Sequence, residues 1–472
     1  MKRASATTSI SLLEKAVFLH VGLLLLGASW VYGGNIWWMR SALAVWADAG
    51  ALLTLFAFIQ KGDAGHEARR KAWWLVPWLL FVSLVVASSF NPSFIPVQFE
   101  GKTLLINLGA PHHGWPSTVN PRPTLDELSF GAGVYLAAFN ILLTARSRQT
   151  LRWLLVFGAV NTVALAVFGT IQKLSSQGYY FGAATSPNVR FFSTFIYYNH
   201  WGAFMVLWLA TSAGLIFYHA INHRARDLWH SPFAVAVIGV LVLAASAPVS
   251  ASRAATGMAG LVFMLVIAHA LGRIAAHRRA QRRPAWPPVL ALLAIAALAV
   301  GAVGWLANRS INERYVETRL ALEKKKSIFE DRLELYRDTW TLAMQKPAFG
   351  WGLESYGTAF MTIRPRPLEA RRQYEASYSE AHSDWLQSVA ETGLVGTALL
   401  LMMAFVPFLS VPRRTLTHPL VGYPLLGCAI IALYAWVEFP FANGAVLIAF
   451  WTVYFSAIRY ARLQGRSDAN EP

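Results

Sequence analysis

Long apolar blocks are the feature that most limits what this chain can fold into. Segments such as FLHVGLLLLGASWVYGG and VLALLAIAALAVGAVGWLA are long enough to cross about 30 Å of hydrocarbon at about 1.5 Å per helical residue. Membrane barrel strands are shorter and alternate polar with apolar residues, whereas these blocks are apolar throughout. Since the chain is 56% hydrophobic and only 14% charged, its charges cannot cover several soluble domains. The sequence therefore predicts an all-α polytopic membrane protein.

The length criterion for a membrane helix gives about twelve spans. They lie near 14–34, 41–60, 72–90, 126–145, 152–173, 199–219, 232–249, 254–272, 287–306, 393–410, 420–437 and 444–458. The first follows a basic start with Lys2 and Arg3, and its apolar run is too long for a cleaved leader, so we expect an uncleaved signal anchor.

Basic residues set the expected orientation. If the amino terminus is cytoplasmic, Lys and Arg concentrate in the loops on that side, at 61–71, 146–152, 224–226, 273–283, 413–414 and 459–466. This positive-inside pattern predicts that both termini are cytoplasmic. The net charge of +17 then reflects topology and attraction to anionic lipid, and no nucleic-acid partner is needed. The chain divides into 1–306 with nine spans, a large outer loop at 307–392, and 393–472 with three spans and a short cytoplasmic tail.

The large outer loop contains a predicted amphipathic helix. Leu333, Tyr336, Trp340 and Met344 recur at spacings of three and four residues and form one apolar face. Such a helix could lie on the membrane surface or act as a structural cap. The following PAFGWG run, 347–352, ends the helix and predicts a tight connection.

A histidine stands at the mouth of the tenth span, in EAHSDWLQSVAETGLVG. Ser383 or Asp384 can cap the helix that follows, and Asp384, Gln387, Ser388 and Glu391 share one of its faces. A helix amino terminus disfavours a protonated imidazole, so His382 is suited to accept a proton from a hydroxyl. A histidine that only forms an interfacial hydrogen bond has the same pattern.

Two arginines lie at the outer ends of other spans. Arg190 precedes the span that begins with Asn199, and Arg253 lies in a very short connection between two spans. An arginine at membrane depth is costly without an anionic partner, and a guanidinium matches phosphate oxygens bidentately. A lipid-linked phosphate would satisfy either arginine, as would snorkelling to lipid headgroups.

These residues together resemble the bacterial O-antigen ligase and O-antigen polymerase superfamily. The resemblance runs in order over roughly residues 185–410. Its motifs are Arg190 with Ser193, Thr194, Phe195 and Asn199; Ser250-Ala-Ser252-Arg253; Arg332-Leu-Glu-Leu-Tyr-Arg337; Pro347-Ala-Phe-Gly350-Trp-Gly352; and His382 with Leu386, Glu391, Gly393 and Gly396. The sequence departs from the commonest pattern at Ser383, where asparagine is more usual, and at Ser193, where glycine is often found.

The resemblance implies a GT-C-like bundle in the bacterial inner membrane with its active site facing the periplasm. Members transfer a glycan from undecaprenyl diphosphate without a nucleotide sugar, catalytic metal or other cofactor. By resemblance, Arg190 and Arg253 would bind the diphosphate and His382 would deprotonate the acceptor hydroxyl, giving inversion. Substrate-binding roles are implied for Asn199, Ser252, Arg332, Arg337, Asp384 and Glu391, and either of the last two could orient the imidazole.

Several functions remain open at this stage. A ligase would use lipid A-core as the acceptor, a polymerase would use another carrier-linked glycan, and a third kind of enzyme would use a protein serine. A secondary transporter is the alternative from another class, but the sequence contains no inverted repeat and no matching pair of broken spans. Its outer-face histidines also lack the H-x-x-x-H spacing of a metal site.

Overall fold

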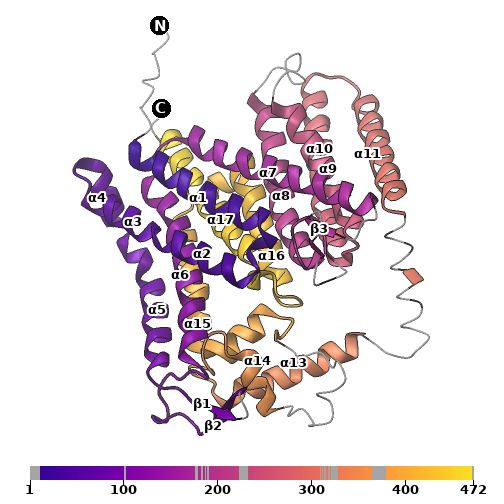
Figure 1. The fold of residues 1–472 in the computed structure, drawn as a ribbon. Coiled ribbons are helices and arrows are strands. Elements are labelled where there is room, and N and C mark those ends of the chain that lie inside the picture. The colour runs from indigo at the N-terminus through magenta and orange to yellow at the C-terminus, as the bar shows by residue number, and fades with distance from the viewer. Residues whose placement is uncertain are drawn as a thin grey trace.

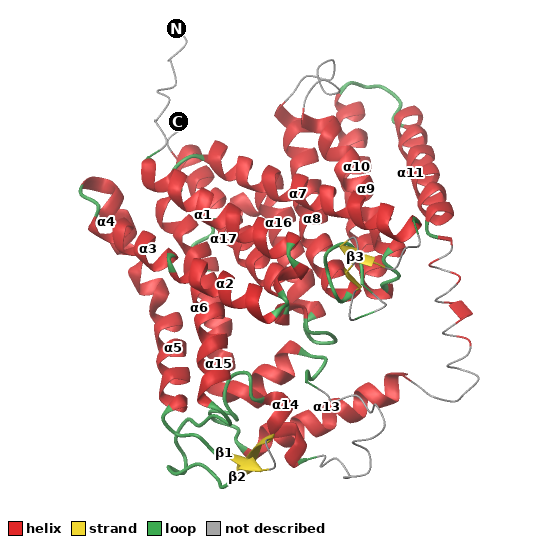
Figure 2. Cartoon of the chain, in the orientation of Figure 1, coloured by secondary structure: helices red, strands yellow, loops and turns green. Residues whose placement is uncertain are grey.

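The computed structural model is built almost wholly of helices (Figure 2). It describes residues 11–99, 102–175, 179–181, 184–185, 188, 191–222, 232–308, 310, 312, 315–316, 319, 328–363 and 379–469. The helices are α1 (Leu12–Trp30), α2 (Trp37–Asp48), α3 (Gly50–Ile59), α4 (Gly62–Arg70), α5 (Val76–Ser89), α6 (Pro121–Thr144), α7 (Arg148–Leu174), α8 (Tyr198–Asn222), α9 (Pro232–Val249), α10 (Arg253–Ala280), α11 (Trp286–Leu306), α13 (Ile328–Gln345), α14 (Tyr356–Ala359), α15 (Asp384–Phe408), α16 (Pro419–Tyr434) and α17 (Gly444–Ala469). Two small antiparallel sheets pair β1 (Phe94–Phe99) with β2 (Lys102–Asn107), and β3 (Tyr179–Phe181) with β4 (Ala184–Thr185).

The predicted membrane architecture is confirmed. In the described chain, eleven helical segments are long and apolar enough to cross a membrane, and α16 is a shorter apolar helix of 16 residues. Each of the twelve segments expected from the sequence coincides with one of them. The span expected at 41–60 is formed by α2 and α3, which are separated at Ala49. The helix α15 begins at Asp384, so the expected boundary at 392 falls inside a helix.

Three helices form the centre of the bundle. The membrane-length windows of α6, α8 and α17 are 78%, 83% and 94% buried, whereas that of α11 is 0% buried and α11 lies at the edge (Figure 1). Tyr135 of α6 meets Trp451 and Phe455 of α17 edge-on, with ring centroids 4.8 and 5.3 Å apart. Such pairs add about 0.5–1.5 kcal/mol beyond their buried area. The packing of these central helices therefore fixes the positions of the segments that lead into α8 and α17.

Two long loops, one between α5 and α6 and the other between α11 and α15, pack together beyond one end of the bundle. Helices α13 and α14 lie there with β1 and β2, away from the end that carries the first and last described residues (Figure 1). Leu335 and Leu342 of α13 share a second hydrophobic core with Phe94 and Val119 from the earlier loop. The backbone N–H of Val119 also donates to Ser355 Oγ at 3.3 Å. These contacts place the two loops on the same face of the bundle.

The helix expected in the large loop is α13, but its apolar stripe is not the face that packs. Leu333, Trp340 and Met344 are 42%, 48% and 38% exposed. The buried side chains are Leu335, Thr339, Leu342 and Ala343. Thr339 is accommodated there because its hydroxyl bonds to the Leu335 carbonyl and to Tyr356 Oη, both at 2.8 Å. The helix carries two such stripes, and the spacing of apolar residues alone could not tell which one the loop covers.

Candidate active site

His382 lies directly before α15 on an unusual backbone. Its φ of +52° lies in the left-handed region, which costs a residue with a side chain about 1–3 kcal/mol. Ser383 caps α15, with its Oγ accepting the Leu386 N–H at 3.3 Å, as one of the two sequence expectations had it. The hydroxyl of Tyr336 on α13 donates to the His382 carbonyl at 3.1 Å. Two separate elements thus hold this histidine in a costly conformation, which is typical of functional positions.

Glu438, in the loop between α16 and α17, is the carboxylate that faces the imidazole. Its Oε2 lies 3.7 Å from His382 Nδ1, within ion-pair range but longer than a hydrogen bond. Its Oε1 accepts Arg332 Nη2 at 2.6 Å. The Glu438 side chain is 5% exposed, while that of His382 is 31% exposed. The buried carboxylate of Glu438 therefore lies on the Nδ1 side of the imidazole. Nε2 lies on the opposite side of the ring.

The charge of Glu438 depends on its neighbours. Burial by itself raises the pKa of the Glu438 carboxyl. The interaction with His382 and the adjacent guanidinium of Arg332 outweigh burial and leave this pKa below its ordinary value. Glu438 is consequently ionised at neutral pH and can stabilise a proton on the imidazole.

A hydrogen-bond network connects this carboxylate to the outer ends of α8 and α10. Asn199 Nδ2 donates to Glu438 Oε1 at 3.0 Å, and Asn199 Oδ1 accepts Ser252 Oγ at 2.7 Å. Ser252 in turn caps α10, accepting the Ala255 N–H at 3.2 Å. Asn199 and Ser252, both expected at the site, are therefore linked to His382 through Glu438.

Arg253 begins α10 immediately after this cap. Its side chain is exposed, and no ion pair joins it to a carboxylate of the described residues. Arg190 lies outside the described residues. Next to it, Phe192 and Phe195 form a short bridge, and Ser193 has a φ of +54°. Glycine adopts this left-handed conformation without the steric cost that a serine side chain incurs.

The two carboxylates expected to orient the imidazole bond elsewhere. Asp384 Oδ2 accepts the Phe441 N–H at 2.9 Å, and so ties α15 to the loop before α17. Glu391 accepts the N–H groups of Glu354 and Tyr356, both at 3.1 Å. In this geometry the carboxylate beside His382 is Glu438. Arg337, also expected to bind substrate, is exposed on α13.

Backbone hydrogen bonds join the PAFGWG run to α15 around Gly393. The helix breaks at Gly393, where φ is +66° and ψ is −175°. The carbonyls of Ala390 and Glu391 accept the N–H groups of Trp351 and Gly352 at 2.9 and 2.7 Å, and the Leu394 N–H donates to the Pro347 carbonyl at 2.8 Å. A Cβ on Gly393 would lie 2.2 Å from the Ala348 carbonyl oxygen. The PAFGWG run and the part of α15 around Gly393 are thus held together by backbone hydrogen bonds.

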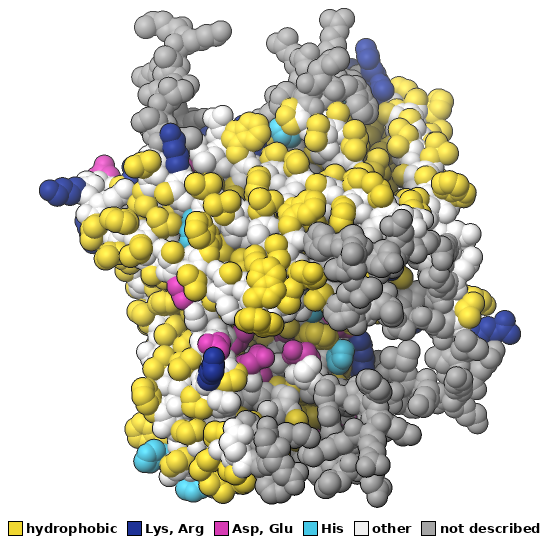
Figure 3. All heavy atoms as spheres, viewed as in Figure 1, with side chains coloured by type: hydrophobic (Ala, Val, Ile, Leu, Met, Phe, Trp, Pro, Cys, Tyr) yellow, Lys and Arg dark blue, Asp and Glu magenta, His cyan; other side chains and the backbone are white. Residues whose placement is uncertain are grey.

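A second charged cluster lies near the same level. Figure 3 shows acidic side chains gathered where the apolar surface of the bundle ends, with basic and histidine side chains beside them. Arg40 pairs with Glu127 at 2.6 Å, and both interact electrostatically with Glu354 and Glu380. Burial, with repulsion from Glu354, raises the pKa of Glu380 to about 7. Within this cluster, the charge of Glu380 therefore changes near neutral pH.

Glu438 is the candidate site residue that sequence reasoning missed. It lies in VEFPF, between two apolar segments, and a lone carboxylate at the end of a span is itself a signal of function. Its partners Arg332 and His382 are 106 and 56 positions away (438 − 332 and 438 − 382), so sequence spacing could not pair them.

Residues 238–401 match the family model of the O-antigen ligases. The matched region is similar to the O-antigen ligases, which supports the O-antigen ligase and polymerase superfamily. It includes Arg253, Arg332 and His382, while Asn199 and Glu438 lie outside it. No curated protein matches the chain. The match supports a glycan transferase of the O-antigen ligase or polymerase type in a multi-pass membrane bundle.

Proposed function

We propose that this protein is an O-antigen ligase that moves a glycan from undecaprenyl diphosphate to a hydroxyl of lipid A-core. The observation that carries the proposal is the pairing of His382 with a buried carboxylate, at the outer mouth of a lipid-embedded bundle. A base supported in this way is suited to activating a hydroxyl, and the family match supports a glycan transferase of the O-antigen ligase or polymerase type.

In the proposed reaction, the acceptor oxygen attacks the anomeric carbon of the glycan. The acceptor proton passes to Nε2 of His382 as the new C–O bond forms. The bond from the anomeric carbon to the phosphate oxygen breaks, and the electron pair leaves with the diphosphate. Attack opposite the leaving group inverts the anomeric centre. Glu438 stabilises the imidazolium that results, because its carboxylate lies 3.7 Å from Nδ1.

Arginine charge would stabilise the departing diphosphate. Arg253 is exposed at the first turn of α10, where the positive end of the helix dipole also favours an anion. The network from Ser252 through Asn199 connects this helix end to Glu438. We assign Arg190 the same role from its motif. Arg332 is committed to Glu438 and the Val437 carbonyl, and so its proposed role is to fix the carboxylate.

This chemistry requires a defined placement in the cell envelope. We propose an inner-membrane location with both termini cytoplasmic and with His382, α13 and α14 on the periplasmic side. The support is the positive-inside pattern of the loops, together with the packing of both long loops at the end opposite the termini (Figure 1).

Reconstitution tests the proposal. Purified protein in proteoliposomes would receive undecaprenyl-diphosphate glycan and either lipid A-core or a second carrier-linked glycan. Glycosylated lipid A-core is the expected product, whereas extension of the carrier-linked chain would replace ligase by polymerase. Arg253→Lys keeps the charge but loses the bidentate fork, and should reduce transfer about 10-fold or more with every acceptor. Arg279→Lys, in the last turn of α10, is the matched control. Solute flux without glycan transfer would exclude the proposed transferase activity altogether.

A further inference from the structure

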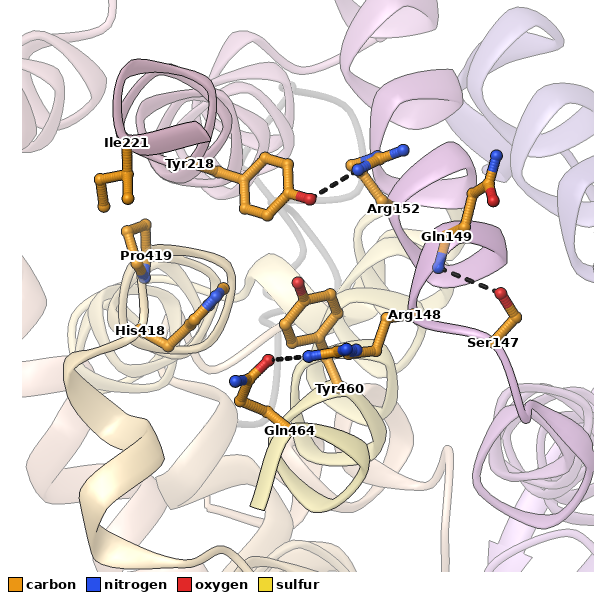
Figure 4. A pocket seen from close by; sticks show the side chains of 10 residues that line it. All are labelled: Ser147, Arg148, Gln149, Arg152, Tyr218, Ile221, His418, Pro419, Tyr460 and Gln464. Atoms are coloured by element: carbon orange, nitrogen blue, oxygen red, sulfur yellow. Dashed lines mark hydrogen bonds between the residues drawn. The ribbon is translucent and has the colours of Figure 1, made fainter. Parts of the chain in front are cut away.

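A polar cavity lies at the end of the bundle away from His382. It has a volume of about 540 Å³ and is formed by the starts of α7 and α16 with the ends of α8 and α17 (Figure 4). Its polar lining includes Ser147, Arg148, Arg152, Tyr218, His418 and Gln464. A volume of this size is typical of small-ligand sites. The glycan chemistry proposed above uses none of these residues.

Two arginines give the cavity its charge. Arg152 Nη1 donates to Tyr218 Oη at 2.6 Å, and its guanidinium lies 5.2 Å from the centre of the tyrosine ring (Figure 4). Arg148 donates to Gln464 Oε1. Both partners are neutral, and within the described part of the chain neither guanidinium forms an ion pair with a carboxylate. The nearby carboxylate of Glu14 instead accepts the backbone N–H groups of Arg146 and Ser147, at 3.2 and 3.4 Å. Two fixed positive charges thus remain uncompensated by these residues.

Two helix amino termini open into the same cavity. Ser147 caps α7, with Oγ accepting the Gln149 N–H at 3.2 Å. His418 caps α16, with Nδ1 accepting the Leu420 N–H at 3.2 Å. Because Nδ1 is the acceptor, the neutral His418 ring carries its proton on Nε2, so it adds a donor and no negative charge. The helix dipoles and the arginines all favour an anion here.

We propose that this cavity binds a phosphate-bearing ligand. Arginine forks match phosphate oxygens in number and geometry, and the tyrosine, glutamine and histidine groups supply further neutral polar contacts. The phosphate could belong to the headgroup of an anionic lipid at this membrane face or to a soluble compound. The inference is independent of the proposed glycan transfer.

Binding measurements on the whole purified protein separate these two sources. In detergent, thermal stability would be followed against inorganic phosphate and pyrophosphate, with chloride at equal ionic strength as the reference. Native mass spectrometry would then count the lipids retained after extraction from vesicles of phosphatidylglycerol or of phosphatidylcholine. The variants are Arg148→Gln, Arg152→Gln and both together. Arg279→Gln, an exposed arginine in the last turn of α10, is the control.

The native protein should bind pyrophosphate or retain phosphatidylglycerol selectively. Loss of a charged hydrogen bond lowers affinity about 10- to 100-fold, so each single variant should fall by that factor while the control stays unchanged. Arg148 is exposed, and its variant remains informative even if the double variant does not fold. The proposal is overturned if neither probe binds, or if Arg148→Gln and Arg152→Gln both bind like the native protein.

Discussion

Replacing Glu438 by glutamine isolates the charge behind the proposed base. The amide keeps an oxygen that can accept the Asn199 and Arg332 hydrogen bonds, now 3.0 and 2.6 Å long, so the local packing should survive. What disappears is the negative charge 3.7 Å from His382 Nδ1. If His382 takes the acceptor proton, this variant should lose turnover, because its imidazolium is no longer stabilised.

The size of the effect follows from that distance. At 3.7 Å, a carboxylate attracts an imidazolium by about 1 kcal/mol in water and about 4.5 kcal/mol at an effective dielectric constant of about 20. The 31% exposure of His382 and the adjacent Arg332 charge both place the value in the lower half of this interval. We expect turnover to fall about 10- to 50-fold, equivalent to about 1.4–2.3 kcal/mol in the activation barrier.

The assay is the initial rate of glycan transfer in proteoliposomes, with donor and acceptor varied separately. Only kcat should fall, while KM for the lipid-linked donor should stay near its native value, because Glu438 is not expected to contact the diphosphate. Turnover equal to that of the native protein would refute the role of Glu438, and a change confined to the donor KM would reassign it to substrate binding.

Three further outcomes follow from the same geometry. His382→Ala should remain folded and inserted but lose about 10²- to 10⁴-fold in transfer rate, and transfer near the native rate would exclude it as the base. Glu391→Ala leaves the buried N–H of Tyr356 and the part-buried N–H of Glu354 without their acceptor, so the thermal midpoint in detergent should fall by the equivalent of about 1–3 kcal/mol for the Tyr356 group; an unchanged midpoint would contradict this role. For Glu380, the folded pKa of about 7 exceeds the ordinary 4.5. The free energy of unfolding of the native protein should therefore decrease as the pH rises from about 4.5 to about 7, by up to about 3 kcal/mol. Glu380→Gln should then be the more stable protein at pH 8 but not at pH 4, and equal midpoints at pH 8 would count against the raised pKa.

The sequence predicts the helical architecture well because membrane spans are local features. Each needs about 20 apolar residues, and a window of that length contains the whole signal. The Ser383 cap and the break at Pro347 are equally local, since both depend on residues within one helical turn. Their positions could therefore be read without any knowledge of tertiary contacts.

The partner of the histidine could not be found in this way. Asp384 and Glu391 are close to His382 in sequence and on an attractive helical face, yet they bond to Phe441 and to the segment before α14. Glu438 reaches the imidazole because α15 and the loop after α16 are brought together by packing. Similarly, the face of α13 that is buried depends on the hairpin loop beneath it, which spacing within the helix does not describe.

The break in α15 at Gly393 divides the helix into two parts with different surroundings. The short first part of the helix starts two residues after His382, while the part after Gly393 runs into the membrane. The Pro347–Gly352 run bonds to both sides of the break, to the carbonyls of Ala390 and Glu391 before it and to the N–H groups of Leu394 and Val395 after it. When membrane thickness changes and the membrane part of α15 tilts, we expect these bonds to hold the break in place and leave the imidazole in register with Glu438. A chain built in this way would keep its activity across bilayers of different thickness, as a single rigid rod in the same position would not.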